Sequence, residues 1–280
     1  MSATSVPLPV IVGVDGSAAA LRAARWAADE AIARGVPLQL IYAVDPESGD
    51  GADTAGRSAA EVALRAAHAA VAATGSPVAI SDQIVTGDPK TELIRASRSA
   101  TLLCVGALGR GHFTHGHVGS TAEALASAAH CPVIIIRDNT KSPAAQDGWV
   151  IAVADESLES SNVVELGVSE ALIRHAPLRI VQALATTGEA AATGGDRQAR
   201  NRLDRYVAHW AHRHPELRVD TEVVHGQILD ILTRLADNIR LVVVGAHDVA
   251  THRDLFGAGG YAALRDSDCP LLVANRRRTL

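Results

Sequence analysis

The stretch LLCVGALGRGHFTHGHVGSTAEALASAAH, residues 102–130, contains three kinds of sequence in a fixed order. It begins with an apolar run typical of a buried strand and ends in an alanine-rich segment, with Glu123 near its start, that favours a helix. Between them lies a loop with glycines at Gly106 and Gly109 and the pair Gly119-Ser120. This order directs backbone N–H groups and the positive end of a helix dipole at one point. The stretch therefore predicts a site for a phosphate-bearing ligand.

The same alternation of apolar runs and helical patterns fills the first half of the chain. Apolar runs that predict strands lie at 8–14, 37–44, 76–85, 102–105 and 132–137. The Asp88-Pro89 pair predicts a helix start, because proline suits the first helical position. Strands that are apolar throughout and alternate with helices indicate an α/β fold with a parallel sheet covered on both faces.

The second half of the chain repeats the landmarks of the first at a nearly constant offset. Asp155 follows Asp15 by 140 residues, and Gly245 follows Gly106 by 139. Two further pairs keep the register: Gly226 with Gly87, and Cys269-Pro270 with Cys131-Pro132. The sequence therefore predicts an internal duplication, with domains at 8–138 and 149–276 joined by a linker at 139–148.

Composition excludes several classes of protein. The chain has 280 residues, 48% of them hydrophobic and only 3% aromatic, and a net charge of −5, so nucleic acid is disfavoured as a partner. Its three cysteines are widely spaced, which suits neither a disulfide framework nor a CxxC metal site. No apolar run reaches the roughly 18 residues that cross a bilayer, and no export signal is present. We expect a cytoplasmic protein that does not enter a membrane.

Other candidate sites are less convincing. His112, His115 and His117 lie inside the glycine loop, but their spacing suits no common metal site, so we expect exposed histidines close to phosphate. The sequence contains neither a GxxxxGK[ST] phosphate loop nor a GxSxG nucleophile elbow. Asp15 has two readings, since it is also placed to cap a helix over 16–34.

Three segments carry a resemblance to a known family. They are VGVDGS at 12–17, the Gly-Asp-Pro of 87–89, and the glycine spacing of 106–120. On these the chain resembles an ATP-binding universal stress protein with two tandem domains, of the actinobacterial type. The resemblance implies two five-stranded parallel sheets with helices on both faces, Rossmann-like and similar to the adenine nucleotide alpha hydrolases. It also implies that a pseudo-twofold axis relates the two domains through their last strands, as in a dimer within one chain.

The resemblance also implies the ligand and its contacts. Asp15 contacts the adenine or ribose end of ATP, Val14 and Ala43 wall the adenine, and the glycine loop holds ribose and phosphates with Mg²⁺. The loop residues assigned in this way are Gly106, Gly109, Gly119, Ser120 and Thr121. These positions also suit a ligand physically, because open α/β sheets leave a crevice at the carboxyl ends of their strands. Glycines there admit phosphate oxygens close to the backbone.

The second copy of the loop departs from this pattern. Asp248 replaces the second glycine, and Gly257-Ala258 stands opposite Gly119-Ser120, so that the hydroxyl is lost. A carboxylate about 5 Å from a phosphate charge costs on the order of 3 kcal/mol at an effective dielectric of about 20. Losing a hydroxyl bond to a charged oxygen adds roughly 1.5–3 kcal/mol. We therefore expect the second copy to bind ATP weakly or not at all.

The sequence favours a stress-response regulatory protein over an enzyme. No general base, metal cluster or catalytic lysine accompanies the loop, so ATP is expected to act as a conformational or partner-binding signal. Two alternatives stay open: an enzyme that slowly hydrolyses ATP or adenylates a substrate, and a scaffold with a vestigial site. The protein partner is unknown, and homodimerisation is left open.

Overall fold

The computed structural model describes residues 7–46, 54–75, 77–109, 118–137, 148–154, 160–184, 189–225, 229, 233, 238–246 and 269–275. The chain divides into two compact units. Unit 1 comprises Met1–Thr114, Val118–Asp138 and Asn275–Leu280, and unit 2 comprises His115–His117 and Asn139–Ala274.

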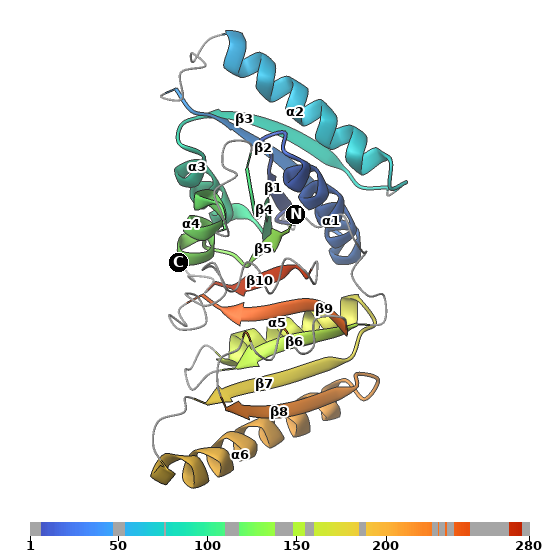
Figure 1. Ribbon diagram of the computed structural model, residues 1–280. Coiled ribbons are helices and arrows are strands. Elements are labelled where there is room, and N and C mark those ends of the chain that lie inside the picture. Colours follow the sequence, from blue (N-terminus) through green and yellow to red (C-terminus); the bar gives the residue numbers. More distant parts are fainter. Residues whose placement is uncertain are drawn as a thin grey trace, which may run out of the picture. The chain divides into compact units, whose positions relative to one another are not determined.

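Unit 1 is a parallel sheet with helices on both faces. Its strands are β1 (Val10–Gly13), β2 (Leu38–Val44), β3 (Ile80–Thr86), β4 (Leu102–Gly106) and β5 (Val133–Ile136), in the order β3-β2-β1-β4-β5. Its helices are α1 (Ala18–Arg34), α2 (Thr54–Ala72), α3 (Pro89–Ala96), the 3₁₀ turn Ser97–Ser99 and α4 (Ser120–Ala128). Figure 1 shows α1 and α2 on one face of the sheet and α3 and α4 on the other.

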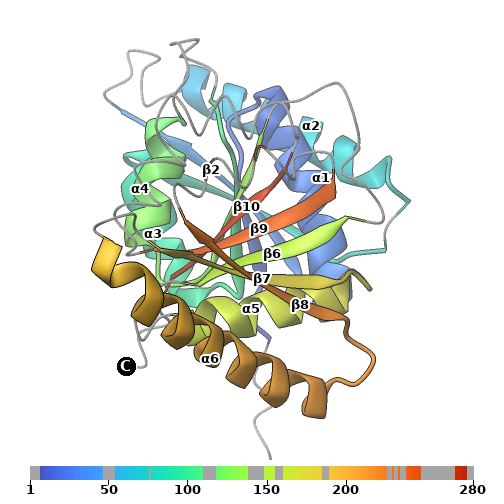
Figure 2. The same cartoon turned by 60° about the horizontal axis from the view of Figure 1, so that its bottom comes forward.

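Unit 2 has the same strand order. Its elements are β6 (Trp149–Ala154), α5 (Ser160–Ile173), β7 (Leu178–Leu184), α6 (Glu189–Arg213), β8 (Val219–His225), β9 (Ile239–Gly245) and β10 (Leu271–Ala274). They form a parallel sheet in the order β10-β9-β6-β7-β8, and α5 and α6 lie on the same face of it (Figure 2). The predicted α/β fold with two copies of one parallel sheet is therefore confirmed. The pairing of the two last strands stays a prediction.

The core of unit 1 depends on small helix side chains. The inner face of α1 consists of fully buried alanines, among them Ala23, Ala27 and Ala31, and the side chains of Val133, Ile134 and Ile135 are equally buried on the sheet. A helix with alanine on its inner face approaches a sheet closely. As a result, α1 comes near enough to the end of β4 to restrict the residues there.

The ends of α1 and α3 follow from local side-chain chemistry. Ser17, not Asp15, is the N-cap of α1, since its side chain accepts the N–H of Ala20 at 3.1 Å. The sequence-based reading of Asp15 as the cap is therefore wrong. The predicted start of α3 is confirmed: Asp88 caps it and proline occupies the first turn. Both helix starts lie directly after the loops that leave the carboxyl ends of β1 and β3.

Candidate functional site

Several of the predicted site residues meet at one edge of the unit 1 sheet. β1 and β4 are adjacent and parallel, so the residues after each strand lie at the same edge. Val14 follows β1, is 5% exposed, and donates its N–H to the carbonyl oxygen of Ile41 at 2.8 Å. Ala43, near the end of β2, is half-buried. The residues expected to wall the adenine therefore lie on adjacent strands at the carboxyl edge.

Asp15 is fixed in place by its neighbours. Its Oδ1 accepts the N–H of Ser17 at 2.9 Å. Its Oδ2 lies only 2.8 Å from the position that a Cβ on Gly109 would occupy. Real Cβ atoms do not approach oxygen so closely, so any side chain at position 109 must displace the carboxylate. The glycine at 109 thus leaves room for the Asp15 carboxylate where it stands, a contact that sequence spacing does not show.

Ser17 links the first strand to the glycine loop. While its oxygen caps α1, its hydroxyl also donates to the carbonyl oxygen of Leu108, at the long distance of 3.5 Å. Sequence reasoning did not assign Ser17 to the site. The sequence did indicate its capping role, however, because a serine directly before an alanine-rich helix is typical of an N-cap.

Gly106 is a packing residue. A Cβ on it would lie 2.7 Å from the Cβ of Ala19 and 3.0 Å from the nitrogen of Ala20, both on α1. We expected this glycine to admit phosphate. In the structure, the absence of a side chain there allows α1 to approach the end of β4 closely. Among the described residues, a Cβ on its counterpart Gly245 would meet only a methyl carbon of Val163, at 3.7 Å.

Gly119 brings the two ends of the loop together. Its N–H donates to the carbonyl oxygen of Ala107 at 2.7 Å, and a Cβ on it would approach that same oxygen to 3.1 Å. Gly119 is also the N-cap of α4, where no side chain caps the helix. Ser120 is exposed and Thr121 half-buried in the first turn. The first N–H groups of α4 are therefore directed toward the edge that carries Asp15 and Gly109, an arrangement suited to an anion.

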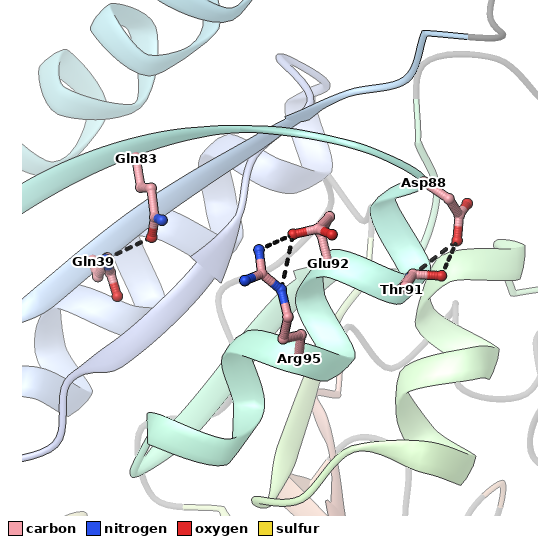
Figure 3. Close-up of polar contacts among 6 residues, drawn as sticks. All are labelled: Gln39, Gln83, Asp88, Thr91, Glu92 and Arg95. Carbon is pink, nitrogen blue, oxygen red and sulfur yellow. Dashed lines mark hydrogen bonds and ion pairs between the residues drawn. The ribbon is translucent and has the colours of Figure 1, made fainter.

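A second helix start lies at the same edge, at the end of β3 (Figure 3). The Asp88 carboxylate accepts the Thr91 N–H at 3.0 Å and its hydroxyl at 2.9 Å. The backbone hydrogen bond is the main cause of an Asp88 pKa below its ordinary value of 3.8. One turn further along α3, Arg95 pairs with Glu92. The carboxylate of Asp88 is committed to the helix, so a ligand is left to Asp15 and the glycine loop.

Some of the predicted features lie outside the described residues. They include His112, His115 and His117, and the unit 2 positions Asp155, Gly226, Asp248, Gly257 and Ala258. Within the part of the chain that the structure describes, no group of three His, Cys, Asp or Glu side chains is placed to hold a metal. Cys104, Cys131 and Cys269 are all buried, as expected for Cys104 and Cys131 from their strands.

The family model of the universal stress proteins matches this chain twice, over residues 8–137 and 150–275. The chain belongs to the universal stress protein family. A universal stress protein of Mycobacterium tuberculosis is 39% identical over 282 residues, 99% of each chain. A second, from the same species, is 36% identical and covers 95% of this chain and 96% of its own. The tandem universal stress protein resemblance inferred from sequence is confirmed.

Solved structures of this family share the fold. A universal stress protein of Archaeoglobus fulgidus superposes with a TM-score of 0.72, at 18% identity, over 96% of this chain and 98% of its own. Among the described helices of this universal stress protein, none has the length and apolar character to cross a bilayer.

Proposed function

We propose that this universal stress protein binds one ATP, with Mg²⁺, at the carboxyl edge of unit 1. The observation that carries the proposal is the convergence of three groups: the fixed Asp15 carboxylate, the loop closed by the Gly119–Ala107 hydrogen bond, and the start of α4, which lacks a side-chain cap. Asp15 contacts the ribose or adenine. The N–H groups of α4, with the hydroxyls of Ser120 and Thr121, hold the phosphates.

ATP in this proposal is a signal and not a substrate. At this edge Asp88 caps α3, while Asp15 accepts the Ser17 N–H with Oδ1 and has Oδ2 against Gly109. Bound nucleotide stabilises the closed form of the glycine loop. It also stabilises the contact that Gly106, at the start of this loop, makes with α1. The effect is a conformational or partner-binding response to stress. Release of ADP or of an adenylated product by purified protein would favour the enzymatic alternative.

Gly109→Ala tests the site most directly. The new methyl group displaces the Asp15 carboxylate, so we expect ATP affinity to fall by about tenfold or more, equivalent to about 1.4 kcal/mol. Calorimetric titration of wild type, Asp15→Ala, Gly109→Ala and Gly119→Ala with ATP measures this. Gly245→Ala in unit 2 is the matched control, because its Cβ would make an ordinary van der Waals contact with Val163, and it should leave ATP affinity unchanged.

Thermal unfolding separates a working site from a vestigial one. A ligand present at 100 times its dissociation constant adds about 2.7 kcal/mol to the free energy of unfolding. Saturating ATP should therefore raise the melting temperature of wild type and of Gly245→Ala, and have less effect on Asp15→Ala. If wild type does not respond, the scaffold reading replaces ours.

A further inference from the structure

A pocket of about 360 Å³ opens in unit 2 at the amino ends of its strands. The proposed nucleotide site of unit 1 lies instead at the carboxyl ends of its own strands. Its volume lies within the roughly 300–1,000 Å³ of small-molecule sites. The end of α5 and the loops that lead into β7 and β8 line it. Its apolar lining consists of Ala171, Leu172, Ala176, Pro177 and Leu217. Small and aliphatic side chains therefore form part of the pocket wall.

Three polar side chains complete the lining of this pocket: His175, Glu216 and Arg218. Glu216 and Arg218 flank the buried Leu217 on the same short loop. The Glu216 carboxylate approaches His214 at 3.4 Å, yet 64% of its side chain is exposed. It can therefore still accept a cation, so the pocket has an apolar lining together with one negative and one positive group.

Arg218 is a cation held against an aromatic ring. Its guanidinium carbon lies 4.9 Å from the centroid of the Trp149 ring, and that of Arg179 lies 4.6 Å from the same ring. The charge of Arg179 is balanced by Asp220 at 3.0 Å and Glu222 at 3.7 Å. Among the described residues, Arg218 has no such carboxylate. Stacking on Trp149 orients its guanidinium while leaving the charge available to an anion.

Unit 1 shows that the fold does not require these charges. The hydrogen bond from Leu38 N to Ala79 O has its counterpart in the bond from Leu178 N to Arg218 O, and both measure 2.9 Å. At the positions of His175, Glu216 and Arg218, unit 1 has Gly35, Pro77 and Ala79. The same backbone is therefore built without any charged side chain. The charges at this edge of unit 2 serve something other than the strand pairing.

We propose that this pocket binds a free α-amino acid with an apolar side chain. The ligand's side chain lies on the apolar lining, its carboxylate pairs with Arg218, and its ammonium group pairs with Glu216. An α-amino acid carries both charges one carbon apart beside an apolar body, which matches two opposite charges on alternate residues of one loop. The proposal does not depend on nucleotide binding, and its test requires no ATP.

The test uses L-leucine with two derivatives that each lack one charge. L-leucinamide lacks the carboxylate, and N-acetyl-L-leucine lacks the ammonium group. In calorimetric titrations of the full chain, we expect L-leucine to bind saturably and both derivatives about three- to tenfold more weakly, since each loses one charged contact. Trp149 lies against Arg218, so its fluorescence should change during the L-leucine titration.

Charge-removing variants locate the two contacts. Arg218→Gln should weaken L-leucine binding by about three- to tenfold and leave L-leucinamide unaffected, since that ligand has no carboxylate to lose. Glu216→Gln should weaken L-leucine similarly and leave N-acetyl-L-leucine unaffected. Arg205→Gln, an exposed change on α6 away from the pocket lining, is the matched control and should bind L-leucine as wild type does.

Three results would overturn the proposal. They are the absence of saturable L-leucine binding in the millimolar range, equal binding of all three ligands, and wild-type affinity in both Arg218→Gln and Glu216→Gln. All the substituted side chains are exposed, so the variants should fold. Unchanged melting temperatures will verify that a loss of binding is not a loss of structure.

Discussion

At the scale of single residues, the glycines of the site lie in close contact with protein neighbours. Spacing alone predicted the positions of Gly106, Gly109 and Gly119. The physical reasons come from contacts between residues far apart in sequence: the packing of α1 on Gly106 and the Asp15 carboxylate over Gly109. Such contacts require the folded arrangement of β1, β4 and α1, so they could not be predicted from a list of spacings.

The Gly106→Ala substitution tests the packing. A methyl group 2.7 Å from the Cβ of Ala19 forces α1 away from β4, and overpacking of this kind costs about 1–3 kcal/mol. Urea unfolding should show this loss. Gly245→Ala places its methyl 3.7 Å from Val163 and should change stability by less than about 0.5 kcal/mol. Equal losses in the two variants would contradict the role given to Gly106.

Asp88 should make stability depend on pH in the acid range. The Thr91 backbone N–H stabilises the charged carboxylate, so the folded pKa lies below 3.8, which is close to the value of the unfolded chain. The contribution is present above the unfolded pKa and is lost as pH falls through the folded one. Because the group is exposed, the effect should be small.

Asp88→Asn isolates this contribution. Asparagine also caps helices but does not titrate. The difference in unfolding free energy between wild type and variant should therefore be constant above about pH 5, and below about pH 4 the wild type should lose stability relative to the variant. Urea unfolding across this range measures it. A difference that stays constant throughout would remove the assignment.

At the scale of elements, the sequence located the strands well and their ends less well. The third strand was expected at 76–85 and lies at Ile80–Thr86. Burial on both faces makes strands visible as apolar runs. The ends depend on turns and caps. At the start of α1, for example, the N-cap is Ser17, whereas the sequence also allowed Asp15.

The first helices of the two units end in the same conformation with different residues. Gly35 ends α1 at a φ of +63°, where glycine is unstrained, and His175 follows α5 at +50°. A residue with a Cβ is strained by about 1–2 kcal/mol in this backbone region. Glycine relieves the strain, but it also raises the conformational entropy of the unfolded chain, which offsets part of the gain. We expect His175→Gly to stabilise the chain by about 0.5–1 kcal/mol in urea unfolding.

Gly35→His is the reciprocal control. Nothing lies within 4 Å of a Cβ at this position, so only the backbone conformation can oppose the substitution. It should destabilise the chain by roughly the amount that His175→Gly gains. Opposite signs in the two variants would support the conformational explanation, and a loss in both would show that His175 makes a stabilising contact of its own.

At the scale of the whole molecule, the duplication predicts one ATP for each chain. Unit 1 joins Asp15, Gly109 and Gly119 at one edge, whereas the copy in unit 2 has Asp248 and Ala258 in its loop sequence. We expect calorimetry to give a stoichiometry near one, with no response to Gly245→Ala. Two equivalent sites for each chain would contradict the expected loss of the second.

The strand order also affects how the protein is made. Each unit begins with its central strand: β1 lies between β2 and β4, and β6 lies between β7 and β9. On the ribosome, β1 is synthesised first yet keeps one edge unpaired until β4 has been added, so the nascent unit carries an open apolar strand for most of its synthesis. The same exposure recurs when β6 emerges. A chain with this strand order therefore exposes an edge open to wrong pairing twice during its synthesis, once in each unit.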